Sequence, residues 1–429
     1  MPCISERAEY IFSLLLRDLM GVELILTDRC EDYFSYSGPR IEYNDVPTGE
    51  GLFFQCCSLL QEKSVKPKDC KLFTYNNIPA FFPVKDKRSV LPFDLFAASF
   101  YLVTRYEEYL PFSPDKFGRF KASDSITTIG NFLKTPIVNL WVEMLKKHLG
   151  IAYPLLEFHE KKYRFVPSID IDHAFAYKQH SLIRTLGGSF RSIMTGDLKK
   201  LAERMKVLLG RVKDPYDQYD YIREIHEQLG LHPYYFILFA DYGRNDNNVS
   251  LSGSLFCKRI RNLDYRRTLG IHPSLTSGTN PDILQSEIKG LSELLGHHVH
   301  TSRQHFLKVS LPYTYHELIK NGITDDYSLG YASDPGFRAG IADSFPFFDL
   351  IANRAEKLII HPVTLMDVTL KDYLGIAPTE AIALGRSFVN KIKAVNGEFV
   401  TIWHNESFDY SGRWKGWKEV YPEILSYAL

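Results

Sequence analysis

Strand-like and helix-like segments alternate from residue 163 to the end of the chain, and this alternation limits the fold more than any other feature of the sequence. Short runs rich in apolar residues predict strands at residues 163–171, 233–239, 267–272, 301–309, 327–332, 358–365 and 399–404. Apolar residues at helical spacing predict helices at residues 216–229, 282–295, 313–321, 379–395 and 417–427. About seven such units favour a barrel over an open sheet, so the sequence predicts an α/β fold with a distorted (β/α)7-type barrel.

The first part of the chain has a different pattern, because it mixes helix and strand signals. Residues 21–27 form a short apolar run that predicts a strand, and helical spacing occurs at residues 9–20, 91–110 and 136–149. The chain of 429 residues is also too long for one ordinary core. We therefore predict a smaller N-terminal α+β domain of unknown role at residues 1–158 and the barrel at residues 159–429. A long polar insert at residues 178–214 interrupts the barrel part, with a helix predicted at residues 197–209.

Charge and composition exclude several classes of protein. The 51 basic and 51 acidic residues balance without a long block of one sign, so a nucleic-acid partner is not expected. The N-terminal residues lack the basic stretch and apolar run of a secretory signal, and no segment approaches the roughly 18 apolar residues of a membrane span. The six cysteines match no zinc-binding spacing and are expected to be reduced thiols. Together these features predict a cytoplasmic protein.

Two carboxylates stand at the end of the first predicted barrel strand. Asp170 and Asp172 end the run Arg164-Phe-Val-Pro-Ser-Ile-Asp-Ile-Asp172. Side chains two apart on a strand point to the same face, and the carboxyl ends of such strands are where α/β folds assemble their sites. One carboxylate could therefore bind a metal while the other accepts a proton. The alternative is a strand that ends in a turn, where Asp makes local hydrogen bonds.

Further ionisable side chains fall at or near the ends of the other predicted strands. Buried ionisable groups are costly unless they are paired or bound to a metal, so packing alone does not explain this placement. Taken together they indicate a metal hydrolase, although each one alone could cap a turn or satisfy a loop carbonyl. These residues are His272, Arg303, His305, Asp326, Arg338 and His404.

The order of these segments resembles the NodB-type polysaccharide deacetylases, carbohydrate esterase family four, and in particular a subgroup with an extra N-terminal domain. The resemblance covers residues 160–429. Ser168-Ile-Asp-Ile-Asp172 is similar to the first motif of the family, and Thr401-Ile-Trp-His-Asn405 is similar to its last. Gly270-Ile-His-Pro-Ser-Leu-Thr-Ser277 and Ser302-Arg-Gln-His305 are similar to the second and third.

The resemblance implies a function and a role for each matching residue. It implies a metal-dependent hydrolase that removes N-acetyl groups from an amino-sugar glycan or glycan precursor, with Asp170 as the general base and His404 as the general acid. Arg303 would orient the base, and Asp172 and His272 would hold a divalent metal ion, with Zn expected and Co or Ni as alternatives. A carbohydrate substrate follows, and Arg338, Asp326 and Trp403 are predicted to contact it.

The sequence departs from the family at one position. The second motif usually supplies two histidines four residues apart, but Thr276 stands where the second is expected. A hydroxyl is a poor replacement for an imidazole on zinc. Either another side chain completes the site, with His305 the first candidate and His300 the second, or water fills the position, or metal affinity is reduced.

Other functions stay open on the sequence alone. A catalytically impaired, deacetylase-like glycan-binding protein would also fit Thr276. A glycoside hydrolase would need a second carboxylate near Asp170, for which Asp326 is the candidate. The N-terminal domain could shape the substrate groove, mediate dimerisation or bind another protein, and the oligomeric state does not follow from the sequence.

Overall fold

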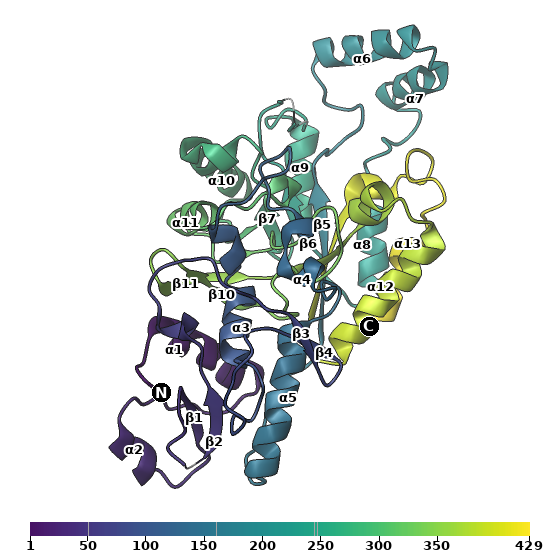
Figure 1. Cartoon of the computed structure of the whole chain (residues 1–429). Helices are drawn as coiled ribbons and strands as arrows, with labels where there is room; N and C mark the ends of the chain where they lie inside the picture. The colour runs from purple at the N-terminus through teal and green to yellow at the C-terminus, as the bar shows by residue number, and fades with distance from the viewer. Residues whose placement is uncertain (50, 160, 244, 247) are drawn as a thin grey trace.

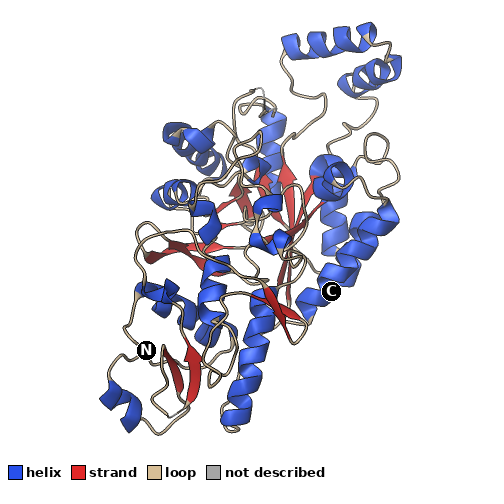
Figure 2. Cartoon of the chain, in the orientation of Figure 1, coloured by secondary structure: helices blue, strands red, loops and turns tan. Residues whose placement is uncertain are grey.

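The computed structural model describes residues 1–49, 51–159, 161–243, 245, 246 and 248–429. Most of its strands gather in one sheet at the centre of the molecule, with helices around it (Figure 2). Nine strands form this sheet in the order β10-β11-β9-β8-β7-β6-β5-β13-β12. Their bounds are β5 (Arg164–Ile171), β6 (Tyr234–Ile237), β7 (Leu269–Ile271), β8 (Thr301–Ser302), β9 (Asp325–Asp326), β10 (Phe345–Asp349), β11 (Arg354–Ile360), β12 (Val363–Met366) and β13 (Glu398–His404).

The two ends of this sheet are joined by one stretch of chain. β11 pairs with β9, and β12 pairs with β13, both in parallel. Because β11 ends at Ile360 and β12 begins at Val363, these two strands connect the β9 side of the sheet directly to the β13 side. Every pair in this sheet except β10 with β11 is parallel, so all of its strands other than β10 present their carboxyl ends on one side. The prediction of an α/β fold is confirmed.

Helices follow most of these strands and pack around the sheet. The ends of α10 show how the local sequence sets a boundary: the Asn280 side chain accepts hydrogen bonds from the backbone of Asp282 and Ile283, and Gly296 ends the helix with a φ of 76°. Among the described residues, none of the helices has the length and apolar character that crossing a membrane would require. The helices are α6 (Leu182–Met194), α7 (Leu198–Leu208), α8 (Tyr219–Glu227), α9 (Ser254–Leu263), α10 (Pro281–Leu295), α11 (Tyr313–Lys320), α12 (Pro378–Lys393) and α13 (Val420–Ala428).

The N-terminal part lies beside the β10 and β11 edge of the sheet (Figure 1). It contains two small sheets, in which β1 pairs with β2 in parallel and β3 pairs with β4 in antiparallel fashion. The mixture of short strands and helices agrees with the α+β character predicted for this region. Its elements are α1 (Glu6–Phe12), α2 (Cys30–Ser35), β1 (Ile41–Asn44), β2 (Leu52–Gln55), β3 (Phe73–Tyr75), β4 (Ile78–Ala80), α3 (Leu95–Val103), α4 (Ile126–Ile129) and α5 (Ile137–Ala152).

The N-terminal part and the barrel part share one hydrophobic core. The ring of Phe348 on β10 lies 4.9 Å from Tyr10 on α1 and 5.1 Å from Phe100 on α3, measured between ring centroids. A buried ion pair also joins the two parts, with Arg338 Nη2 2.6 Å from Glu108 Oε2. The N-terminal part therefore packs as a layer on the barrel, and the boundary after residue 158 stays a prediction.

Among the described residues, two predicted strands are absent from the structure, and one helix of the polar insert was not predicted. Residues 21–27 form no strand, because their backbone pairs with no neighbouring strand. The apolar side chains of this run line a cavity of the N-terminal part. Residues 327–332 also form no strand, since β9 already ends at Asp326 and a turn follows. Helix α6 was not predicted, because its apolar residues lie in a segment interrupted by Gly187 and Gly188.

Candidate metal centre

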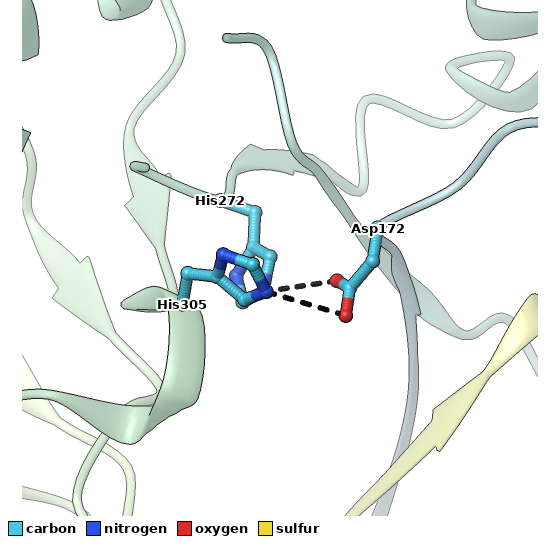
Figure 3. A group of neighbouring side chains, drawn as sticks. All are labelled: Asp172, His272 and His305. Atoms are coloured by element: carbon cyan, nitrogen blue, oxygen red, sulfur yellow. Dashed lines mark ion pairs between the residues drawn. The ribbon is translucent and has the colours of Figure 1, made fainter. Parts of the chain in front are cut away.

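Three side chains converge at the carboxyl end of the sheet, and Figure 3 shows them pointing at one another. Asp172 follows β5 and His272 follows β7, while His305 begins a short 3-10 helix after β8. The Nε2 atom of His272 lies 3.2 Å from Asp172 Oδ1, and that of His305 lies 3.4 Å from Asp172 Oδ2. One possible ligand atom from each residue fits within a group 4.8 Å across, so these three residues could hold a metal ion.

The second ring nitrogen of each histidine is held by the protein. His272 Nδ1 contacts the backbone carbonyl of Arg303, and His305 Nδ1 lies 2.8 Å from Asp246 Oδ1. A carbonyl or carboxylate oxygen can only accept, so both Nδ1 atoms donate and both Nε2 atoms are left with their lone pairs when the rings are neutral. This is the arrangement in which histidines bind metal ions, because the outer contact fixes the tautomer and the ring orientation.

The carboxylate of Asp172 fits the same interpretation. Its Oδ1 atom is buried and accepts no hydrogen bond from a described residue. Burial alone would raise the pKa of Asp172, but the imidazoles of His305, His272 and His404 outweigh it and hold that pKa well below its usual range. Asp172 is therefore ionised, and a cation would stabilise its buried Oδ1 atom.

Asp170 lies deeper in the same end of the sheet and is paired with an arginine. Arg303 Nη1 donates hydrogen bonds to Asp170 Oδ1 and to Ser168 Oγ, both at 2.7 Å. The guanidinium lies over the ring of Phe236, 4.2 Å from its centroid. The other oxygen, Asp170 Oδ2, lies 4.0 Å from His272 Nε2 and so faces the three-residue group. The arginine therefore fixes the carboxylate while one oxygen stays directed at the site.

His404 completes the site from β13, where it is in register with Asp170 on β5. Its Nδ1 lies 2.8 Å from Asp367 Oδ1, and its Nε2 lies 3.7 Å from Asp172 Oδ2. Burial lowers the pKa of His404, but Asp367 outweighs it and raises that pKa to about 10. At neutral pH the ring carries a proton on Nε2, directed at the site.

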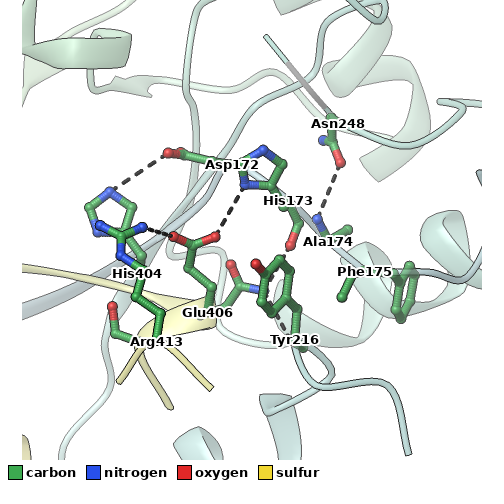
Figure 4. Close-up of polar contacts among 12 residues, drawn as sticks. Asp172, His173, Ala174, Phe175, Tyr216, Asn248, His404, Glu406 and Arg413 are labelled. Atoms are coloured by element: carbon green, nitrogen blue, oxygen red, sulfur yellow. Dashed lines mark hydrogen bonds and ion pairs between the residues drawn. The ribbon is translucent and has the colours of Figure 1, made fainter. Parts of the chain in front are cut away.

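A second charged group lies beside these residues, in the segments that follow Asp172 and His404 (Figure 4). Glu406 Oε2 lies 3.3 Å from His173 Nδ1, and Glu406 Oε1 accepts a hydrogen bond from Arg413 Nη1 at 3.3 Å. This carboxylate is thus held between two cationic or hydrogen-bonding side chains. It fixes the loop after β13 against the loop after β5.

A loop of the N-terminal part reaches the same side of the molecule. Phe117 stacks on Phe306, with ring centroids 4.7 Å apart, and Arg119 Nη1 donates to the Phe306 carbonyl at 2.8 Å. Phe306 directly follows His305 and has a positive φ of 60°, a conformation that non-glycine residues adopt only at an energetic cost. The N-terminal part therefore supports the turn that carries one of the three converging side chains.

A cavity of about 490 Å³ lies between that loop and the barrel. Its size falls in the range of small-molecule sites. A second cavity, of about 380 Å³, lies within the N-terminal part, and none of its described lining residues comes from the barrel. The first cavity is lined by Arg119, Phe120, Leu307, Tyr331, Arg338 and Tyr373, among others.

The structure does not bring all of the predicted site residues together. Asp326 is fully buried, and its carboxylate accepts from Ser302, Ser328 and the backbone of Ser328. Trp403 points to the helical side of β13, where its ring lies 4.8 Å from that of Tyr421. This burial does not support substrate contacts by either residue. Arg338 lines the larger cavity, but its guanidinium is buried against Glu108.

Thr276 and His300 lie outside the three-residue group. Both are exposed, and neither belongs to a candidate metal group among the described residues. The sequence offered His305 and His300 as candidates for the third ligand, and the structure places His305 in the group. Strand β8 ends at Ser302, which pairs with the last residue of β7. The turn of residues 303–307 therefore begins next to His272, and it carries His305 to the site.

Three residues around the candidate site were not identified from the sequence: Asp246, Asp367 and Glu406. Asp367 directly follows β12, so the strand-end signal that identified Asp172 could have found it. Glu406 stands two residues after His404 and could have been found by its proximity. Asp246 lies in an irregular loop rich in Asn and Asp, where no single residue stands out.

Comparisons with known proteins give limited matches. A family model described as a family of unknown function, DUF7033, matches residues 1–154. No curated protein matches the chain. A crystal structure described as a "putative polysaccharide deacetylase" from Mycobacterium smegmatis is 17% identical, covers 62% of this chain and 83% of its own, and has a TM-score of 0.40. A crystal structure of Puue allantoinase is 11% identical, covers 72% of this chain and 92% of its own, and has a TM-score of 0.37. At this level of similarity no activity is transferred from either protein.

Proposed function

We propose that this chain is a metal-dependent hydrolase that removes N-acetyl groups from an amino-sugar glycan or a glycan precursor. The observation that supports it most is the orientation of His272 and His305. Their Nδ1 atoms are held by a carbonyl and a carboxylate, and their Nε2 atoms both face Asp172. A hydrolase also needs a base and an acid, and Asp170 and His404 both lie next to this group.

In this proposal Asp172, His272 and His305 hold a divalent ion, with Zn expected and Co or Ni as alternatives. Two imidazole nitrogens and one carboxylate oxygen are a ligand set that suits these metals. When bound, such an ion polarises an acyl carbonyl and increases the acidity of a water molecule. The buried Asp172 Oδ1, which accepts no hydrogen bond from a described residue, supports the assignment, because an ion there would satisfy it.

The protein's own residues would carry the proton transfers. Asp170 Oδ2 faces the group and would remove a proton from the attacking water, while Arg303 holds the carboxylate through Oδ1. His404 would donate its Nε2 proton to the nitrogen of the leaving amine as the carbon–nitrogen bond breaks. Asp367 supports this role, since it keeps His404 protonated at neutral pH.

The carbohydrate substrate is supported by the cavity that Leu307 lines, two residues after His305 in the chain. Sugars stack on aromatic rings and bond to polar groups beside them. This cavity is lined by the rings of Phe120, Tyr331 and Tyr373 and by the polar side chain of Arg119. The cavity lies between the barrel and the N-terminal loop of Phe117 and Arg119. We therefore assign the N-terminal part a role in shaping the substrate groove, one of the three roles that the sequence left open.

The proposal includes a (β/α)7-type barrel and a cytoplasmic location. The predicted number of seven parallel strand positions in the barrel is supported if β11 and β12 are counted as one position. The other six are β5, β6, β7, β8, β9 and β13. All six cysteines are free thiols, which supports a reducing compartment.

The alternatives have less support. A glycan-binding protein without turnover was suggested by Thr276, but His305 supplies the imidazole that seemed to be missing. A glycoside hydrolase would need Asp326 at the site, and that carboxylate is buried among serine hydrogen bonds.

Elemental analysis and acetate release test the proposal together. We expect purified protein to carry Zn, Co or Ni and to release acetate from an N-acetylhexosamine oligomer. Asp172→Ala should lose both metal and activity, whereas Thr276→Ala, at an exposed position outside the group, should keep both. Protein that carries no metal and releases no acetate under any metal supplementation would refute the proposal. Shortened oligomers without acetate would favour the glycoside hydrolase.

A further inference from the structure

Helices α6 and α7 form a hairpin that stands away from the rest of the molecule (Figure 1). We call residues 181–213 the hairpin. It lies in the connection from β5 to α8, which leaves the sheet at the carboxyl end of β5, where Asp170 and Asp172 lie. The hairpin therefore extends from the side of the barrel that carries the candidate site.

The apolar residues of α6 face outward. They recur at helical spacing and occupy one continuous face of the helix. Their exposed fractions range from 56% to 84%. A helix on a water-exposed surface normally turns this face to the core, so the polarity of α6 is reversed. The residues of this face are Leu182, Ile183, Leu186, Phe190, Ile193 and Met194.

The small and polar face of α6 packs on α7 instead. Ser192 is buried, and Arg204 Nη1 of α7 contacts the Thr185 carbonyl and Ser189 Oγ, both at 3.3 Å. A side chain at Gly188 would meet the Arg204 guanidinium within 2.4 Å. These contacts fix which face of α6 is turned inward, so the outward position of the apolar face is built into the hairpin.

The second helix exposes apolar side chains as well. Leu198, Met205 and Leu209 follow one another along one side of α7 and its end, and all three are exposed. With Leu208 and Val212, the hairpin exposes eleven large apolar side chains. A continuous exposed apolar face such as that of α6 marks a site that another molecule or a membrane covers.

The hairpin is also strongly basic in a chain whose net charge is zero. Residues 181–213 contain eight Lys and Arg residues and two acidic residues, which gives a formal charge of +6. The two acidic side chains are engaged, because Asp197 caps α7 and Glu203 accepts from the Tyr177 hydroxyl. Lys199 and Lys206 are exposed next to the apolar stripe of α7.

We propose that the hairpin docks on the surface of an anionic lipid bilayer. Its leucine, isoleucine and phenylalanine side chains would enter the boundary between headgroups and acyl chains, and its lysines and arginines would contact the lipid phosphates. Exposed apolar side chains beside basic residues are the combination that interfacial helices use. A second copy of the chain fits less well, since two hairpins of formal charge +6 would repel each other.

Vesicle flotation of the full chain tests this proposal without any need for enzymatic activity. We expect the protein to float with vesicles of phosphatidylcholine and phosphatidylglycerol, to bind pure phosphatidylcholine more weakly, and to be released by salt. The double variant Phe190→Ser with Ile193→Ser should lower partitioning at least about tenfold. The variant Lys199→Glu with Lys206→Glu should lose the preference for the anionic lipid.

A matched control uses exposed apolar residues elsewhere. Ile151→Ser with Leu155→Ser, on the N-terminal part, should leave flotation unchanged. All the substituted side chains are exposed, so melting temperatures should stay close to that of the wild type. Absence of wild-type flotation with anionic vesicles would overturn the proposal, as would equal flotation of the wild type and the Phe190 and Ile193 variant. A dimer that the hairpin substitutions convert to a monomer, without vesicle binding, would assign the surface to a second copy of the chain.

Discussion

The Asp246 carboxylate lies 2.8 Å from Nδ1 of His305 and directs the opposite nitrogen of that ring at Asp172, 3.4 Å away. The two residues come from different loops, one after β6 and one after β8. The same carboxylate oxygen accepts from the backbone of Leu275, close to His272 in the chain. Asp246 therefore ties together the two loops that bring histidines to the candidate metal centre.

Asp246→Asn should weaken metal binding without removing a ligand. The amide keeps an acceptor but loses the charge that orients His305 and makes it more basic, and such outer contacts are typically worth about 10- to 100-fold in metal affinity. Competition with a chelator would measure the change. Asp325→Asn is the matched control, because Asp325 pairs with His361, an imidazole outside the group. Equal affinity of Asp246→Asn and the wild type would contradict the role of Asp246.

Arg303→Lys should lower the turnover number by about 100-fold and leave the metal content unchanged. Lysine keeps the positive charge but cannot reproduce the contacts of the guanidinium with Asp170, Ser168 and the Tyr327 carbonyl. Steady-state kinetics with elemental analysis would separate the two effects. Arg7→Lys, an equally buried arginine far from the site in the N-terminal part, should lose stability without this loss of turnover. Loss of metal from Arg303→Lys would show instead that Arg303 supports the ligands.

Phe117→Ala should raise the KM for an oligomeric substrate by about two- to tenfold, because it removes the stack on Phe306 that holds the N-terminal loop at the cavity. The turnover number and metal content should change little. Phe112→Ala removes another aromatic contact, to Phe120, from the same loop and serves as the comparison. If Phe117→Ala loses metal while KM stays constant, the loop acts on His305 and not on the substrate.

His226 should make the protein less stable in mild acid. Its ring is buried between the Ile222 carbonyl and the Tyr421 hydroxyl, and burial lowers its pKa to about 4. The unfolded chain binds a proton below about pH 6.5, whereas the folded chain does so only below about pH 4. The unfolded state therefore holds more protons in this window, and stability falls as the pH drops through it, by roughly 3 kcal/mol at most.

Thermal unfolding across this pH range measures the effect. The loss of stability should be smaller in His226→Gln, whereas His300→Gln, at an exposed position, should follow the wild type. Identical pH profiles for His226→Gln and the wild type would contradict the assignment.

The residues at strand ends could be predicted from the sequence, because a strand that ends in a polar residue places it at a known edge of a parallel sheet. Asp170, Asp172, His272 and His404 all follow this rule, and β5 and β13 bring Asp170 and His404 into register. Strand β8 has only two residues, so the sequence overestimated its length, yet Arg303 still follows its end.

Contacts between loops could not be predicted in the same way. Asp246 reaches His305 only because the loops after β6 and β8 fold over one another, and no periodicity encodes that contact. The junction of β11 and β12 could not be predicted either. The sequence predicts a single strand at residues 358–365, but in the structure its first part pairs with β9 and its last part pairs with β13. The outward apolar face of α6 was missed as well, because Gly187 and Gly188 interrupt the segment and the helix itself was not predicted.

Anomalous diffraction at the Zn absorption edge, from crystals of the Zn-loaded protein, tests the central claim most directly. We expect one strong peak within bonding distance of the Asp172 carboxylate and of Nε2 of both His272 and His305. A fully loaded protein with its peak elsewhere, or with no peak among these three side chains, would contradict it.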